Sequence, residues 1–205
     1  MSYESEIKEK TGTNSFGDDR LNIPVLKYFW QASPLSGARS KGVHNFLRKV
    51  RVLDNFTDYE LRRFSKFLHL RSFHAGEKIF LEGSGGFGFY LIYSGNVDII
   101  SGGIGDDQGQ IITTLGEGEY FGELALLEER SVRNATAQAK NQVTLLAFFK
   151  PDLDELTERY PVVASKLLRS VSLIVSRRFK AVANELKVLK EKLKVVESES
   201  KQKAK

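Results

Sequence analysis

The sequence has 205 residues, of which 41% are hydrophobic and 28% charged, a composition typical of one globular domain with short appendages. It contains no cysteine, which excludes disulfides, thiolate zinc sites and cysteine nucleophiles and fits a reducing, cytoplasmic compartment. The excess positive charge lies at the C-terminus, because residues 177–205 hold ten Lys or Arg against four Asp or Glu and the remainder is close to neutral. A nucleic-acid-binding fold would instead concentrate positive charge on its folded face.

Residues 1–22 are polar, and we predict a disordered tail that lacks the apolar stretch of a signal peptide. Residues 23–42 begin with the apolar run IPVLKYFW and continue through the Pro-, Ser- and Gly-rich stretch SPLSGARSKG. Two interpretations of this linker stay open: it packs on the main body, or it is a docking peptide for a partner. We favour the first, because nothing else in the sequence supports docking.

Two helices are predicted before the central region. Apolar residues recur three or four positions apart from Val43 to Val50. A second helix is predicted over residues 57–69, because Thr57 and Glu60 have the spacing of a capping box and apolar residues follow at helical spacing.

The central region has a period of two. Five short segments rich in β-branched and aromatic residues are separated by glycine clusters: 78–82, 89–93, 96–100, 110–115 and 142–149. This spacing predicts a mainly β fold, an antiparallel sandwich or barrel with flanking helices. Eight such strands in two facing sheets would make a jelly roll.

A long C-terminal helix completes the chain. Pro151 is expected as the first residue of a short helix that ends near Arg159, and one helix without Gly or Pro follows Pro161. Its apolar residues form a heptad seam: Phe179, Val182, Leu186, Leu189, Leu193 and Val196. We expect the seam to pair with the same helix of a second chain as a coiled-coil homodimer, parallel or antiparallel. The alternative is that the helix packs on its own domain.

The most informative segment of the sequence extends from Gly116 to Ala137, and its candidate binding residues begin at Phe121. Phe121 and Gly122 lead into the helix-forming residues ELAL, and exposed backbone N–H groups at such a turn can bind an anion. Arg133 follows at the start of the next predicted strand, where a guanidinium suits a phosphate with two exposed oxygens. Glu123 would repel phosphate but accept a hydrogen bond from a sugar hydroxyl, so the pair describes a nucleotide site.

These residues resemble the phosphate-binding cassette of cyclic nucleotide-binding domains, found in protein kinase A regulatory subunits and the catabolite activator protein. The motif FGELAL and the triplet Arg133-Asn134-Ala135 match the cassette. The resemblance extends from about Val43 to Phe179 through the motif AGEKIF, the Glu82-Gly83 loop and the Ser94-Gly95 turn. It divides the chain into a cyclic nucleotide-binding domain over 43–180 and a basic coiled-coil extension over 181–205.

The resemblance implies a role for each cassette residue. The backbone of Gly122, Leu124 and Ala125, next to Phe121, would lie near the cyclic phosphate and ribose, and Glu123 would bind the ribose 2′-hydroxyl. Arg133 would pair with the phosphate oxygens, assisted by Asn134 and Ala135. An eight-stranded jelly roll is implied, whose last helix covers the purine, here through Ser170 or Ser172. The implied protein is a non-enzymatic sensor of cAMP or, as a second possibility, cGMP, which signals to a downstream protein through its C-terminal helix.

The sequence departs from the family pattern at three places, of which the third bears on the ligand. Val132 stands where many members have proline, the loop Gly85-Gly86-Phe87 lacks the usual aspartate, and Asn134 leaves the base preference open. The alternative function is a ligand-free scaffold of the same fold that works through its coiled coil.

Other classes of function have little support. His69 and His74 are expected to be surface residues rather than metal ligands, because no acidic cluster lies beside them. No P-loop or Ser–His–acid pattern supplies a catalytic group, so we expect no enzyme and no cofactor beyond the nucleotide. No run of apolar residues is long enough to span a membrane. Only the heptad and a polar tail follow Phe179, so we expect no helix-turn-helix and no sequence-specific nucleic acid partner.

Overall fold

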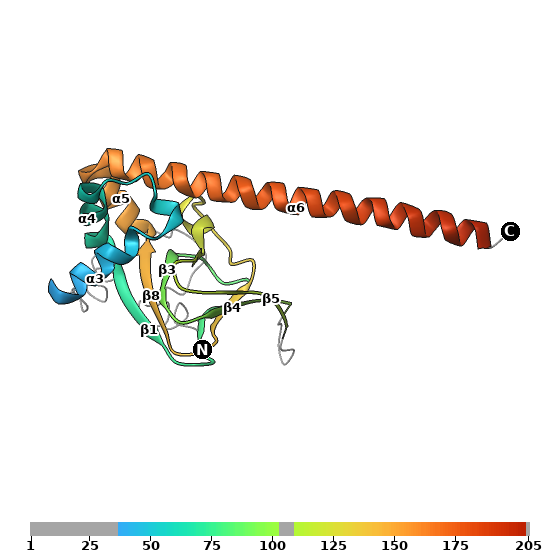
Figure 1. Cartoon of the computed structure of the whole chain (residues 1–205), viewed down its shortest axis with the longest axis horizontal. Coiled ribbons are helices and arrows are strands. Elements are labelled where there is room, and N and C mark those ends of the chain that lie inside the picture. Colours follow the sequence, from blue (N-terminus) through green and yellow to red (C-terminus); the bar gives the residue numbers. More distant parts are fainter. Residues whose placement is uncertain (1–36, 103–108, 204–205) are drawn as a thin grey trace. The chain divides into compact units, whose positions relative to one another are not determined.

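The computed structural model describes residues 37–102 and 109–203 (Figure 1). The predicted tail over 1–22 and most of the predicted linker over 23–42 lie outside this part. The chain divides into two compact units, one that ends at Leu168 and one that begins at Arg169. The first unit therefore ends before the predicted domain boundary at residue 180.

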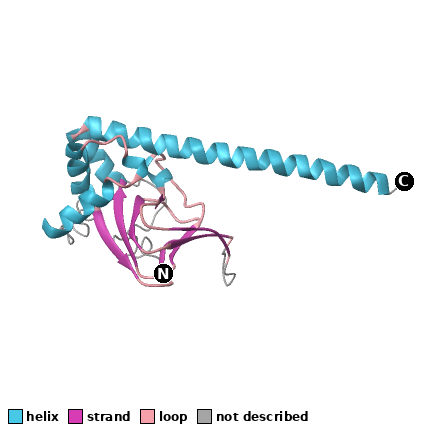
Figure 2. Ribbon diagram, in the orientation of Figure 1, coloured by secondary structure: helices cyan, strands magenta, loops and turns pink. Residues whose placement is uncertain are grey.

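The first unit contains two antiparallel sheets of four strands each, with helices beside them (Figure 2). One sheet has the order β1-β8-β3-β6 and the other β2-β7-β4-β5. The strands are β1 (His69–Phe73), β2 (Lys78–Phe80), β3 (Gly88–Ser94), β4 (Val97–Ser101), β5 (Gln110–Leu115), β6 (Tyr120–Phe121), β7 (Thr136–Ala139) and β8 (Val143–Phe149). The predicted antiparallel β class with flanking helices is confirmed.

Strand β8 lies at the centre of the first sheet, between β1 and β3. Its register runs from Phe73 opposite Val143 to Gly88 opposite Phe149. The alternate residues from Val143 to Phe149 join the core cluster, as the period of two predicted. The other face is also buried, because helices cover it: the ring of Phe148 lies 5.2 Å from that of Phe64 in α4. A strand covered on both faces reads as a continuous apolar run.

The helices before the first strand are α3 (Gly37–Leu47), η1 (Arg51–Leu53), α4 (Asp58–Phe64) and η2 (Ser65–Phe67). The capping box of α4 is confirmed, because the Thr57 N–H donates to Glu60 Oε2 at 2.7 Å and the Glu60 N–H donates to Thr57 Oγ1 at 3.4 Å. The predicted extension of this helix to residue 69 is wrong. The chain passes through the 3-10 turn η2 and becomes extended at Leu68, because the following residues pair with β8.

The expectation of two surface histidines is correct for one of them. His74 is exposed, whereas His69 is largely buried, with Nε2 3.0 Å from both carboxylate oxygens of Asp152. Asp152 also accepts a hydrogen bond from the Phe149 N–H at 2.8 Å, which caps α5 (Lys150–Arg159). His69 thus ties β1 to the start of a helix. Within residues 37–102 and 109–203, no three His, Asp or Glu side chains gather as a metal site would require.

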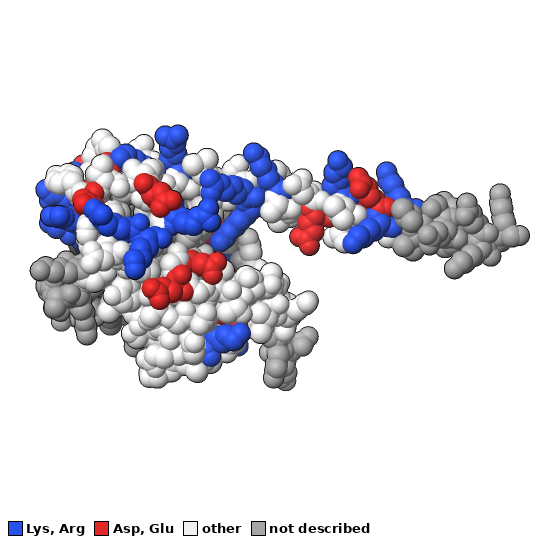
Figure 3. Space-filling view, viewed as in Figure 1, with Lys and Arg blue, Asp and Glu red and all other residues white. Residues whose placement is uncertain are grey.

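Helix α6 (Pro161–Lys203) is continuous, as predicted, and its portion from Arg169 onward forms the second unit. The seam residues from Phe179 to Leu193 are all exposed, and the side chain of Val196 lies outside the described part. Lys and Arg side chains are spaced along this helix (Figure 3). Within the described residues, no helix combines the length and apolarity needed to cross a membrane.

Candidate functional site: a buried arginine beside a glycine turn

The site starts from a sharp turn after β6. Gly122 has a φ of +77° and a ψ of 16°, in the left-handed region that glycine adopts without steric cost. A Cβ atom at this position would lie 2.7 Å from Nη1 of Arg133 and 2.8 Å from the carbonyl oxygen of Gly88. Glycine is therefore required both for the turn and for the close approach of the arginine. The 3-10 helix η3 (Glu123–Leu126) follows directly.

Arg133 approaches this turn from the loop before β7. The residue is buried, with 4% of its surface exposed. The guanidinium donates from Nη2 to the Gly88 carbonyl at 2.9 Å and from Nη1 to the Gly122 carbonyl at 3.3 Å. The arginine thus connects the start of β3 with the glycine turn, and its charge lies beside the first residues of η3.

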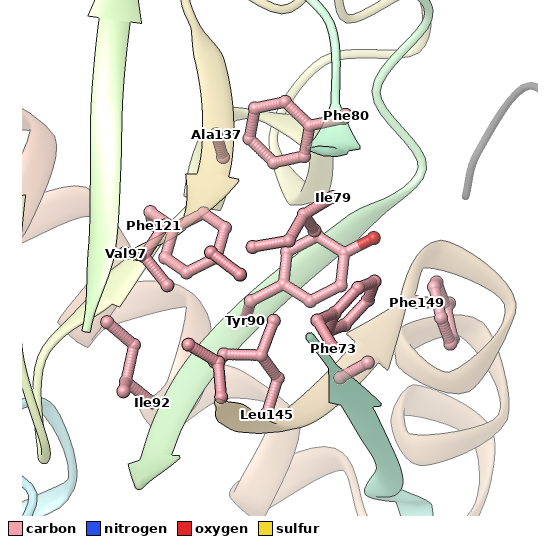
Figure 4. Packing of buried hydrophobic residues seen from close by; sticks show 13 residues of the cluster. Phe73, Ile79, Phe80, Tyr90, Ile92, Val97, Phe121, Ala137, Leu145 and Phe149 are labelled. Carbon is pink, nitrogen blue, oxygen red and sulfur yellow. The ribbon is translucent and has the colours of Figure 1, made fainter. Parts of the chain in front are cut away.

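An aromatic cluster lies beneath the guanidinium. The central carbon of the Arg133 guanidinium, Cζ, is 4.0 Å from the ring centroid of Phe80 and 5.7 Å from that of Tyr90. The rings of Tyr90 and Phe121 stack with their centroids 5.3 Å apart, and Phe80 lies 5.7 Å from Phe121 (Figure 4). Cation–π attraction to such ring faces stabilises a guanidinium that has been removed from water.

The structure brings several of the predicted site residues together. Gly122 contacts Arg133 directly, and Glu123, 4% exposed, is the next residue of the turn. The side chain of Phe121 faces the core, so a contact of this residue with a ligand would come from its backbone. The other predicted residues range from buried to exposed: Ala125 is buried, Leu124 and Ala135 are half-buried, and Asn134 is exposed.

This arrangement suits an anion that also carries a hydroxyl group. A guanidinium stays charged at any physiological pH and offers a planar fork of N–H donors that matches phosphate oxygens. The first N–H groups of a helix have no acceptor within the helix, so the turn from Gly122 into η3 adds donors of the same kind. A carboxylate such as Glu123 contributes acceptors for a hydroxyl.

Phe80, Gly86 and Gly88 belong to the surroundings of Arg133, and the sequence did not assign them to the site. The motif AGEKIF, which ends at Phe80, was only a mark of the resemblance, and the glycine loop Gly85-Gly86-Phe87 was a departure from the family pattern. Their contacts with an arginine in a distant part of the chain follow from the pairing of β2 with β7 and of the glycine loop with residues 131–133.

Residues 70–160 match the family model described as the cyclic nucleotide-binding domain. The chain is 36% identical over 112 residues to the cAMP-dependent protein kinase regulatory subunit of Schizosaccharomyces pombe, a match that covers 55% of this chain and 26% of that protein. It is 37% identical over 110 residues to human cGMP-dependent protein kinase 2, covering 53% of this chain and 14% of the kinase. The chain thus spans about a quarter or less of these two relatives.

Solved structures give the same assignment of the fold. The crystal structure of the Thermus thermophilus catabolite activator protein superimposes with a TM-score of 0.58 at 31% identity, covering 67% of this chain and 62% of that chain. The match therefore includes most of the first unit of the present structure.

Proposed function

Residues 70–160 belong to the family of cyclic nucleotide-binding domains, and on this premise we propose that the chain is a non-enzymatic sensor that binds cAMP or cGMP. The phosphate is the part of the ligand that Arg133 and the Gly122 turn recognise. Glu123 accepts a hydrogen bond from the ribose 2′-hydroxyl. Leu124, Ala125, Asn134 and Ala135 complete the contacts from both sides of the cyclic phosphate, with the backbone of Phe121 next to them.

The position of the Arg133 guanidinium carries this proposal. It is buried, charged and held by the carbonyls of Gly88 and Gly122 directly beside the turn. A guanidinium held in this orientation places a permanent positive charge and fixed N–H donors beside the turn, which suits the recognition of a phosphate.

The choice between the two purines rests on the relatives. The relatives described above include a cAMP-dependent and a cGMP-dependent protein at similar identity. We place cAMP first, because the regulatory subunit, which is named for cAMP, is matched over a larger share of its own length than the kinase named for cGMP.

The signal is proposed to leave the domain through α6. Its exposed seam suits a second copy of the same helix, so that a homodimer would report occupancy to a downstream protein. The allosteric coupling free energy between ligand and helix would be about 1–3 kcal/mol, as in other switches. The alternative, a ligand-free scaffold that works through the coiled coil, predicts the same dimer without any nucleotide response.

Thermal unfolding distinguishes the two functions. We expect cAMP at a hundred times its Kd to stabilise the 205-residue chain by about 2.7 kcal/mol, a Tm increase of roughly 5 °C or more. The linear nucleotide 5′-AMP serves as the control and is expected to leave Tm unchanged, because its phosphate is a dianion that is joined to the ribose through O5′ alone and is not closed into a ring with O3′. A Tm that no cyclic nucleotide changes would contradict the sensor and favour the scaffold.

A further inference from the structure

The glycine loop over residues 83–88 is a feature that the proposed contacts with the nucleotide do not use. It runs alongside the segment that carries Arg133. The Gly83 N–H donates to the Arg133 carbonyl at 2.8 Å, the backbone N–H of Arg133 donates to the Ser84 carbonyl at 2.9 Å, and the Gly86 N–H donates to the Ser131 carbonyl at 2.8 Å. These backbone hydrogen bonds fix the main chain of the arginine against the loop.

Gly86 also limits where the arginine side chain can lie. A Cβ atom on Gly86 would be 3.2 Å from both Cζ and Nε of Arg133, and 3.2 Å from Oγ of Ser131. The guanidinium therefore packs against a bare Cα. The backbone of Gly86 lies outside the left-handed region that favours glycine, so the space next to Arg133, rather than the conformation, requires a residue without a side chain.

Phe80 bounds the guanidinium from another direction. Its ring centroid lies 4.0 Å from Arg133 Cζ, and the ring is itself buried in the core cluster. The side chain of Arg133 is thus confined by a ring face, by the Cα of Gly86 and by hydrogen bonds to two carbonyls.

We propose that Phe80 and Gly86 are positioning residues, which fix the guanidinium of Arg133 in the orientation in which it receives a phosphate. The proposal rests on the proposed function for its effect on ligand affinity, but the confinement itself is independent of any ligand. A binding group that is already ordered loses little rotamer entropy on binding, and a shift of about 0.5 Å is enough to weaken a site of this kind. The glycine loop would therefore act as a holder for the arginine and not as a phosphate loop.

A double-mutant cycle, measured by thermal unfolding of the full chain without nucleotide, tests whether Gly86 confines the side chain of Arg133. Gly86→Ala is expected to lower Tm by about 3 °C, because the added methyl group crowds the guanidinium. In the Arg133→Ala background the same substitution is expected to cost less than half as much, because the main group it meets is gone. The same loss in both backgrounds, or no loss in either, would overturn the proposal.

Affinity for cAMP, measured by calorimetry, tests the effect on the site. Gly86→Ala is expected to weaken binding about tenfold, the effect of impairing one charge-assisted hydrogen bond. The matched control is Gly116→Ala, in which the new Cβ lies 3.3 Å from Asn96 Nδ2 in a different loop, and its affinity should stay within about twofold of the wild type. Equal affinities for Gly86→Ala and Gly116→Ala would contradict the positioning role.

Phe80 is tested by the conservative variant. Phe80→Leu removes the ring and is expected to weaken cAMP binding, whereas Phe80→Tyr keeps the ring face and should restore most of the affinity. Phe73→Leu removes a ring of the same core cluster and serves as the control for a loss of packing alone. If Phe73→Leu weakens binding as much as Phe80→Leu, the role of Phe80 is only structural. If the wild type binds no cyclic nucleotide, the proposed function fails. The double-mutant cycle in Tm then still tests whether Gly86 confines Arg133.

Discussion

Gly122 is the residue on which the geometry of the candidate site depends most directly. Its left-handed backbone lets the chain turn into η3, and its missing side chain makes room for Nη1 of Arg133. The sequence identified both residues, because the cassette motif is specific. It could not identify Phe80 or Gly86 as neighbours of the arginine, because contacts between distant segments depend on strand pairing, which a local pattern does not encode.

Gly122 and Gly118 both have a positive φ, so a comparison of their alanine variants separates the cost of backbone strain from the cost of steric contact. Gly122→Ala is expected to destabilise the fold by more than 2 kcal/mol, because it combines the cost of about 1–2 kcal/mol for a left-handed alanine with contacts shorter than 3 Å. Gly118 has a φ of +82° and nothing within 4 Å of its Cβ position, so Gly118→Ala should incur the conformational cost alone. Urea unfolding of both variants measures the difference, and equal losses of stability would show that the turn does not contact Arg133 closely.

At the scale of the elements, the capping box of α4 has a second partner. Glu60 Oε2 accepts a hydrogen bond from the Thr57 N–H and another from Nζ of Lys166 in the first turns of α6, both at 2.7 Å. Burial by itself raises the pKa of the Glu60 carboxyl, but the hydrogen bonds from Lys166 and Thr57 outweigh it, so the pKa lies below its ordinary value of 4.5. The carboxylate therefore links α4 to the helix that follows α5.

This link predicts a dependence of stability on pH. A carboxyl whose pKa is lowered by folding stabilises the protein fully above its unfolded pKa, and that contribution is lost as the pH falls through the folded pKa. We expect Glu60→Gln to reduce the free energy of unfolding by about 1 kcal/mol at pH 7, with the difference from the wild type decreasing below pH 4.5. Denaturant unfolding at pH 7, 5 and 4 measures it, with the exposed Glu128→Gln as the control. A difference that is constant with pH would contradict this role of the carboxylate.

Elements with a strong local signal were predicted well. The capping box, the start of α6 at Pro161 and five of the eight strands follow from residue spacing. Strand β1 was not predicted. The helix was extended to its first residue, His69, because Leu68 continues the helical spacing, and only the pairing with β8 makes the following residues extended. Strands β6 and β7 were not bounded, because two to four residues are too few to establish a period.

At the scale of the whole molecule, the proposed dimer depends on the exposed seam of α6. Leu189 belongs to the seam and is 55% exposed, and its neighbour Val188 lies outside the seam and is 49% exposed. Leu189→Asp is expected to weaken dimerisation at least about a hundredfold, because an unpaired carboxylate buried between two helices costs several kcal/mol. Val188→Asp should leave the dimer unchanged. Light scattering coupled to size exclusion measures the mass of each variant, and two monomers, two dimers or a monomeric wild type would contradict a dimer formed through the seam.

The proposed recognition of a cyclic phosphate by Arg133 is tested most directly by titration calorimetry with cAMP and cGMP on the wild type and Arg133→Ala. Arg130→Ala is the matched control, because Arg130 is an exposed arginine in the same loop. We expect the wild type and Arg130→Ala to bind at least one of the two nucleotides at micromolar concentration, and Arg133→Ala to bind it at least about a hundredfold more weakly. Equal affinity of Arg133→Ala and the wild type, or a wild type that binds neither nucleotide, would contradict the proposal.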